Sequence, residues 1–275
     1  MDFFTVRTVI GEPDPAVREC VCSALLNAEF AHIIACPSLL KLHQTIRREG
    51  ADLLILNASM DGEDTSFITT GIRSGKLGRD PFTIIIVLMA TTDTARARSI
   101  ADSGADDALL LPVASDVLIK KVTDLSGPRK PFVVTCDYIG PERRATPRPN
   151  RTSAMQIEVP NPLAGRRGDG YAAVRDASRE RVFMERTARL AAQIGWLIDA
   201  IGEAVIKDEP IVPFLFRLDQ VGKELAECMA APEWIERIRR LLALARAIRI
   251  SQTAVSPNAL AELTAAAGVI RGVPS

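Results

Sequence analysis

The chain has 275 residues, of which 47% are hydrophobic and 25% are charged. Thirty-four basic side chains balance 34 acidic ones, so the formal net charge is zero. This balance excludes a strong overall field toward nucleic acid or an anionic membrane, although a local basic patch is still compatible with it. No apolar run reaches the ~18 residues of a membrane-spanning helix, and the opening MDFFTVRTVI lacks the features of a signal peptide. We therefore expect a cytoplasmic protein that does not enter a membrane and is large enough for two domains.

The cysteines and histidines indicate neither disulfides nor a metal centre. The five cysteines are odd in number, scattered, and form no C-x-x-C pair. They are Cys20, Cys22, Cys36, Cys136 and Cys228. Only His32 and His43 are available to join them in a metal site. We expect reduced thiols, no metal and no cofactor.

The first part of the chain alternates short apolar runs with helical stretches. The apolar runs occupy residues 5–10, 31–36, 52–57, 83–89 and 108–111. Nearly continuous hydrophobic runs are typical of strands that are buried on both faces of a parallel sheet. The pattern predicts an α/β domain over residues 1–127, with a doubly wound five-stranded parallel sheet. In such a sheet, chemistry lies at the carboxyl ends of the strands.

Residues 128–170 have the composition of a linker. The stretch 141–170 holds five prolines, three glycines, and six arginines against three acidic residues. Proline fixes φ and removes a hydrogen-bond donor, which makes regular structure difficult. We expect a solvated, locally basic tether here.

The last part, residues 171–275, has apolar residues at helical spacing. Proline 210 separates one long amphipathic stretch from the next, and Pro232 suits the first turn of a third helix. In 232–250 the apolar residues face one way and most arginines the other. Short connections between amphipathic helices predict an all-α bundle.

Several motifs of the first part resemble the receiver domain of bacterial response regulators (CheY-like), over roughly residues 4–126. GEPDPAVREC (11–20) is similar to the acidic turn after the first strand of that family, and DLLILNASMDGED (52–64) to its third strand and phosphoacceptor loop. IIIVLMATTD (84–93) and GADDALLLPV (104–113) are similar to its fourth and fifth strands. The resemblance implies a flavodoxin-like fold.

The family's chemistry is phosphoryl transfer to an aspartate, assisted by Mg²⁺ and by a cation and a hydroxyl group that meet the developing charge. This sequence departs from the pattern at most of those positions and keeps only one metal-binding carboxylate, Glu12. Asn57 replaces the acceptor, Glu12 and Pro13 replace the paired metal-binding acids, Met89 replaces the hydroxyl residue, Leu111 replaces the lysine, and Ala108 replaces the aromatic switch residue. An amide cannot form an acyl phosphate. The resemblance therefore implies a degenerate phosphoacceptor site with no catalytic residue, which we call a pseudo-receiver.

We accordingly expect no enzyme, but a bacterial two-component (phosphorelay) signalling protein that acts through protein–protein contacts. Its partners would be proteins of a signalling pathway, such as a kinase or another regulator, and a homodimer is left open. We also expect Met89 and Leu111, at the ends of adjacent strands, to fill the former crevice with apolar atoms.

Two other residues offer alternative phosphoryl chemistry. Asp61 could be a substitute acceptor, but it lacks the neighbours that this role needs, and a turn residue is the simpler interpretation. His43 could be a relay histidine, but it also lacks the required neighbours, and a surface histidine is the simpler interpretation. The stretch 260–270 resembles the start of a helix-turn-helix without a recognition helix, so DNA is not an expected partner.

The spacing of Arg144 and Arg148 is similar to the R-x-x-x-R of PilZ domains, although the motif and β-barrel that should follow are missing. The alternative function is therefore an output protein that binds a cyclic dinucleotide or nucleic acid through arginines of the bundle or the linker. The linker candidates are Arg143, Arg144 and Arg148.

Overall fold

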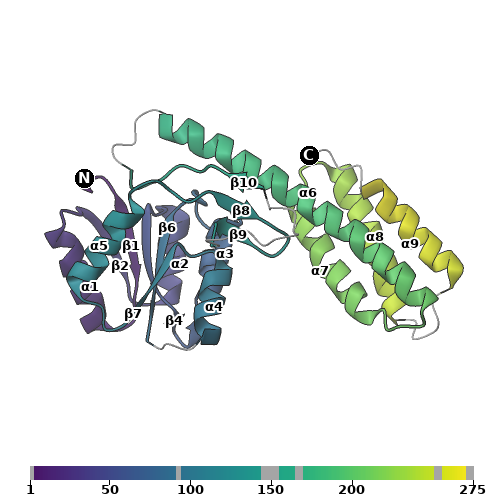
Figure 1. Ribbon diagram of the computed structural model, residues 1–275, viewed down its shortest axis with the longest axis horizontal. Coiled ribbons are helices and arrows are strands. Elements are labelled where there is room, and N and C mark those ends of the chain that lie inside the picture. The colour runs from purple at the N-terminus through teal and green to yellow at the C-terminus, as the bar shows by residue number, and fades with distance from the viewer. Residues whose placement is uncertain (1–2, 91–93, 144–154, 165–169, 251–255, 271–275) are drawn as a thin grey trace. The chain divides into compact units, whose positions relative to one another are not determined.

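The computed structural model describes residues 3–90, 94–143, 155–164, 170–250 and 256–270 (Figure 1). The chain divides into two compact units, Met1–Glu180 and Arg181–Ser275. Among the described residues, none of the helices has the length and apolar character needed to cross a membrane.

The first unit is built on a five-stranded parallel sheet in the order β2-β1-β3-β6-β7. Its strands are β1 (Arg7–Gly11), β2 (His32–Cys36), β3 (Leu53–Asn57), β6 (Ile84–Met89) and β7 (Asp107–Leu110). Every neighbouring pair is parallel. This is the flavodoxin-like doubly wound order, so the fold predicted from the alternating apolar runs is confirmed.

Helices cover both faces of this sheet (Figure 1). They are α1 (Pro15–Asn27), α2 (Leu39–Arg48), α3 (Ser66–Arg73), α4 (Thr94–Ser103) and α5 (Ser115–Leu125). One core cluster joins alternate strand residues, such as Leu54 and Leu56, to α2, α3 and α4. The other joins the intervening residues, such as Leu53 and Ile55, to α1 and α5. Successive side chains of a strand point to opposite faces, so burial of both faces explains the unbroken hydrophobic runs.

Parts of the segment that we expected to be a linker are folded. The described residues 128–143 and 155–164 contain a three-stranded antiparallel sheet of β8 (Phe132–Val134), β9 (Ile139–Pro141) and β10 (Gln156–Ile157). Phe132, Ile157 and Leu163 are buried. The prolines do not prevent this sheet because they lie outside its strands, apart from Pro141, which is the last residue of β9.

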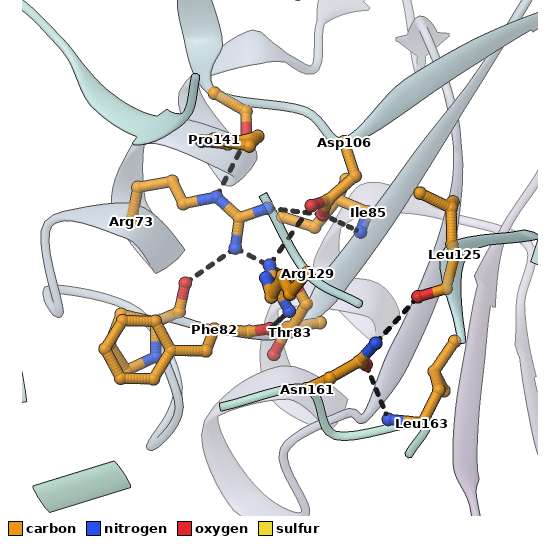
Figure 2. Close-up of polar contacts among 12 residues, drawn as sticks. Arg73, Phe82, Thr83, Ile85, Asp106, Leu125, Arg129, Pro141, Asn161 and Leu163 are labelled. Carbon is orange, nitrogen blue, oxygen red and sulfur yellow. Dashed lines mark hydrogen bonds and ion pairs between the residues drawn. The ribbon is translucent and has the colours of Figure 1, made fainter. Parts of the chain in front are cut away.

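We call residues 128–143 and 155–164 the extension. A buried ionic cluster joins the extension to the amino ends of the sheet strands (Figure 2). Arg73, at the end of α3, is only 1% exposed at its side chain, and its Nη2 donates to Asp106 Oδ2 at 2.7 Å. The same guanidinium donates to the backbone oxygens of Gly104, Pro81 and Thr83 at 2.6–2.8 Å. The charge of Arg73 is therefore matched by a carboxylate and by three carbonyl dipoles.

Arg129 brings the extension to the same carboxylate. Its Nη2 donates to Asp106 Oδ1 at 3.1 Å and its Nη1 donates to the carbonyl of Phe82. Both guanidinium groups lie over the ring of Phe132, with their carbons 5.1 and 5.2 Å from its centroid. Burial lowers the pKa of Arg129 and the neighbouring Asp106 raises it again, with a net lowering. The guanidinium stays charged at neutral pH.

Asn161 ties the far end of the extension to α5. Its Nδ2 donates to the carbonyls of Leu125 and Gly127, both at 2.8 Å, and its Oδ1 accepts from the backbone N–H of Leu163 (Figure 2). The last carbonyls of a helix have no partner within it. Asn161 therefore satisfies the carboxyl end of α5 and fixes Leu163 in the core cluster on that face.

The second unit is a helical bundle, as predicted. Its helices are α6 (Gly170–Ile206, in this unit from Arg181 onward), α7 (Val212–Cys228), α8 (Pro232–Ile250) and α9 (Pro257–Ile270). A single cluster of buried aliphatic side chains runs through all four. Gly222 of α7 permits close packing, because a Cβ added there would lie 2.6 Å from Leu242 of α8.

We predict that Asp106→Asn strongly destabilises the first unit. The substitution leaves two buried guanidinium groups without a counter-charge, which costs about 3–5 kcal/mol of unfolding free energy. Denaturant unfolding of the full chain measures this loss of unfolding free energy. Asp102→Asn is the matched control, because Asp102 pairs with Arg143 but is 72% exposed, and it should cost less than about 1 kcal/mol. Equal effects of the two substitutions would contradict the role given to the cluster.

Candidate functional site

The residues predicted to mark the site lie at the carboxyl edge of the sheet. Glu12 follows β1 directly, and Asn57 is the last residue of β3, the strand paired with β1. Asn57 Nδ2 donates to Glu12 Oε2 at 2.8 Å, although the two residues are 45 positions apart. Glu12 has 0% exposure. The structure therefore brings these two together in a partly buried polar contact.

The remaining polar atoms of this pair are also occupied. Glu12 Oε1 accepts from the backbone N–H of Asp14 at 3.0 Å, and Asn57 Oδ1 accepts from that of Ser59 at 2.9 Å. Each oxygen of the carboxylate thus receives a hydrogen bond, as a buried charge requires. The contact works only with a donor at position 57. An aspartate there would place two acceptors against each other.

Pro13 contributes its carbonyl to the site and has no carboxylate. Arg18 of α1 donates from Nη1 to the carbonyls of Glu12 and Pro13 at 2.7 and 3.0 Å. Asp14 caps α1 by accepting from the N–H groups of Ala16 and Val17. The acidic turn is therefore held by protein donors. Sequence reasoning missed Arg18, which reads as an ordinary exposed helix residue.

The loop after β3 is a tight hairpin that sequence reasoning also missed. Its strands are β4 (Ser59–Met60) and β5 (Glu63–Asp64), joined by Asp61 and Gly62 with φ values of 52° and 83°. An Asp-Gly pair with positive φ at both positions is the signature of a two-residue type I′ turn. The side chain of Asp61 accepts from the backbone N–H of Leu39, the first residue of α2. Asp61 is thus a turn residue that also caps a neighbouring helix.

Arg96 of α4 fixes the other side of this hairpin. Its Nη2 donates to the carbonyl of Ala58 at 2.5 Å, and its Nη1 lies 3.2 Å from Asp64 Oδ2. Burial raises the pKa of Asp64, but hydrogen bonds from Ser66 and the charge of Arg96 outweigh this and hold it below its usual value. A cation therefore does lie beside the end of β3, anchored to the backbone and to an acid.

Three further predicted site residues lie at or near the ends of β6 and β7, but they do not share one cavity. Met89 is the last residue of β6, Ala108 lies within β7, and Leu111 directly follows β7. Met89 is buried in the cluster under α2, α3 and α4, and half-buried Ala108 packs against the same cluster. Leu111 packs against the cluster on the opposite face, under α1 and α5. The expectation that Met89 and Leu111 fill one crevice together is therefore wrong. Adjacent parallel strands end side by side, but position along each strand decides which face a side chain meets.

The residues at this edge do not fit Mg²⁺. A hard cation needs several oxygen ligands, whereas both oxygens of Glu12 already accept from N–H groups and position 13 is proline. Within the described ranges there is no group of three or more His, Cys, Asp or Glu side chains arranged for a metal.

Of the three linker arginines considered for nucleotide binding, Arg144 and Arg148 lie outside the described residues. Arg143 is engaged: its guanidinium carbon lies 4.1 Å from the centroid of Tyr138 and its Nη1 is 2.5 Å from Asp102 Oδ1. The hydroxyl of Tyr138 donates to the carbonyl of Pro141, and burial raises its pKa to about 12. The ring is therefore a neutral platform for Arg143.

Comparison with known proteins finds similarity at the level of structure. No protein-family model matches the chain, and no curated protein matches it. The chemotaxis response regulator CheY4 of Vibrio cholerae is similar, with 17% identity over 44% of this chain and 98% of that one, at a TM-score of 0.40. A response regulator from Thermotoga maritima has 25% identity over 43% of this chain and 96% of that one, at a TM-score of 0.38. Other similar solved structures are a response regulator receiver domain protein (CheY-like) from Methanospirillum hungatei JF-1 and a signal receiver domain from Bermanella marisrubri.

We predict that Asn57→Asp destabilises the protein in a pH-dependent way. The new carboxyl group at position 57 would face the buried carboxylate of Glu12. Repulsion between the two negative charges would raise the pKa of the new group in the folded state. A raised pKa means that the folded state binds the proton more tightly, so the loss of stability should be largest near neutral pH. It should shrink as pH falls toward about 4, the unfolded-state pKa. Near neutral pH we expect a loss of about 1–3 kcal/mol in urea unfolding.

Asn57→Ala is the matched control for this experiment. It removes the same hydrogen bonds without placing a second carboxylate against Glu12, so its loss of stability near neutral pH should be smaller than that of Asn57→Asp and should change less over the same pH range. An Asn57→Asp variant as stable as the parent near neutral pH would show that the edge of the sheet is hydrated and open.

Proposed function

We propose that the first unit is a receiver-like domain without phosphorylation chemistry, a pseudo-receiver that serves two-component signal transduction through protein–protein contacts. The observation that carries this proposal is the hydrogen bond between Asn57 Nδ2 and Glu12 Oε2 at 2.8 Å. It occupies the place where an acceptor carboxylate and a metal-binding carboxylate would have to face a shared cation.

The chemistry of the neighbouring positions supports the same function. Phosphoryl transfer to a side chain needs a carboxylate nucleophile and groups that stabilise charge on the phosphoryl oxygens. Asn57 offers an amide, while Met89 and Leu111 offer apolar side chains packed into the two cores. Arg96 supplies a charge, but its donors already bind Ala58 and Asp64.

A signalling role without phosphorylation requires another input. A ligand or partner shifts a conformational equilibrium only by its difference in affinity for the two states. In this proposal that difference comes from a protein partner, a kinase or another regulator, which binds the surface of the first unit or the helical bundle. The protein would then act in the cytoplasm as a non-enzymatic adaptor.

We predict that the full chain forms no phosphoryl adduct with a small-molecule phosphodonor and Mg²⁺. Position 57 has no anionic oxygen to attack the donor. Intact-mass measurement after incubation with acetyl phosphate is the test, with a phosphorylatable receiver domain treated in parallel as the positive control. A stable mass increase of one phosphoryl group on this chain would contradict the proposal, and fragment masses would locate the acceptor.

We predict in addition that Asn57→Asp alone does not restore the reaction. That variant would still have proline at position 13 and no lysine at position 111, so metal binding and charge stabilisation would still be missing. The combination of Asn57→Asp, Pro13→Asp, Met89→Thr and Leu111→Lys introduces the residue types that the resembled family has at these four positions and is the matched comparison. Phosphorylation of the single variant at the rate of the positive control would show that these groups are not what the site lacks.

A further inference from the structure

A hollow of about 380 Å³ lies between α8 and α9 of the helical bundle. Its walls are formed by Arg237, Arg240 and Leu244 of α8 and by Glu262, Ala265 and Ala266 of α9. This volume falls within the range of about 300–1,000 Å³ that is typical of small-molecule sites.

Small residues on α9 explain why the space is open. The sequence TAAAGVI places Ala265 and Ala266 where longer side chains would reach across to α8. Leu244 and Ala266 are half-buried and pack against the bundle core. The floor of the hollow is therefore apolar and is supported by the fixed core below it.

The rim of the hollow carries two arginines one helical turn apart. Arg240 has neither an ion pair nor a hydrogen bond with any residue that the structure describes, and Arg237 contacts only the ring of Trp234, at 4.7 Å. Other arginines of α8 are engaged, since Arg246 binds Asp219 at 2.7 Å and Arg249 lies 4.4 Å from the centroid of Phe216. The hydrogen-bond donors of Arg240 thus remain available at the hollow.

The residues that line the hollow carry one positive charge in excess, because two arginines and one glutamate are among them. A guanidinium offers a planar fork of donors that matches a carboxylate. An anion with a short apolar body would place its charge at Arg240 and its body against Leu244 and the two alanines.

We propose that the hollow between α8 and α9 binds a small monoanionic carboxylic acid with an apolar body. The proposal concerns the helical bundle alone and is independent of whether the first unit can be phosphorylated. It gives the bundle a ligand-binding role in addition to any contact with a protein.

Octanoate is the probe for this site. Isothermal titration of the full chain with octanoate should give a dissociation constant of about 1 mM or tighter. Acetate, which lacks the apolar body, and octan-1-ol, which lacks the charge, should each bind at least about tenfold more weakly. Octan-1-ol binding as tightly as octanoate would overturn the proposal, and so would the absence of octanoate binding at about 1 mM.

Two variants and a control locate the binding. Arg240→Gln removes the free guanidinium, and Ala265→Phe fills the hollow; each should weaken octanoate binding by about tenfold or more. Arg239→Gln is the control, because Arg239 is exposed on the same helix but does not line the hollow, and it should bind as the parent does. Circular dichroism checks that each variant is folded. Equal binding by the Arg240→Gln and Arg239→Gln variants would overturn the assignment.

Sedimentation of the same samples tests a different occupant. The proposal expects the assembly state of the parent and of Ala265→Phe to be the same. A parent dimer that Ala265→Phe converts to a monomer would show that a second copy of the chain fills the hollow, and it would overturn the small-ligand proposal.

Discussion

A fully buried carboxylate at the carboxyl edge of the sheet constrains everything around it. Glu12 has 0% exposure, so its charge is stable only if protein groups donate hydrogen bonds to it. The amide of Asn57 supplies one donor and the turn after Glu12 supplies the other. Because Nδ2 of Asn57 is committed to Glu12, its Oδ1 turns to Ser59 and sets the start of the β4–β5 hairpin. One neutral amide thus connects the end of β1 to the loop after β3.

The β4–β5 hairpin in turn contacts two helices, α2 and α4. Asp61 accepts from the first N–H of α2, and Asp64 pairs with Arg96 of α4. At the opposite, amino edge of the strands, Asp106 similarly gathers Arg73 and Arg129, with ring contacts to Phe132. Both edges of the sheet are therefore closed by a carboxylate that binds donors from distant parts of the chain. Removing Asp106 leaves two buried guanidinium groups without a counter-charge, and removing the amide of Asn57 leaves the buried carboxylate of Glu12 with one donor fewer.

The sheet and the adjacency of Glu12 and Asn57 were predictable, because buried runs reveal the strands and carboxyl ends of parallel strands meet at one edge. The cluster around Asp106 was not. Arg73 at the end of an amphipathic helix reads as solvated, and its carboxylate partner lies 33 positions away. The folded extension could not be predicted for a similar reason. Its proline and arginine content is typical of a tether, and the sequence does not show that Arg129 pairs with the buried Asp106 and lies over the ring of Phe132. Sequence periodicity also placed Met89 and Leu111 at one edge without assigning them to opposite faces.

Under the proposed function, the arrangement at the carboxyl edge would hold one conformation instead of switching between two states. A phosphorylation switch works because a new charge binds one state better than the other by several kcal/mol. Here, the donors that could meet such a charge are engaged: Asn57 binds Glu12, Arg18 binds the turn, and Arg96 binds the hairpin. A change of state would have to break these contacts before it formed new ones. The free energy for any such change would therefore come from binding of a partner, and the carboxyl edge would serve as a fixed part of the scaffold that presents the binding surface.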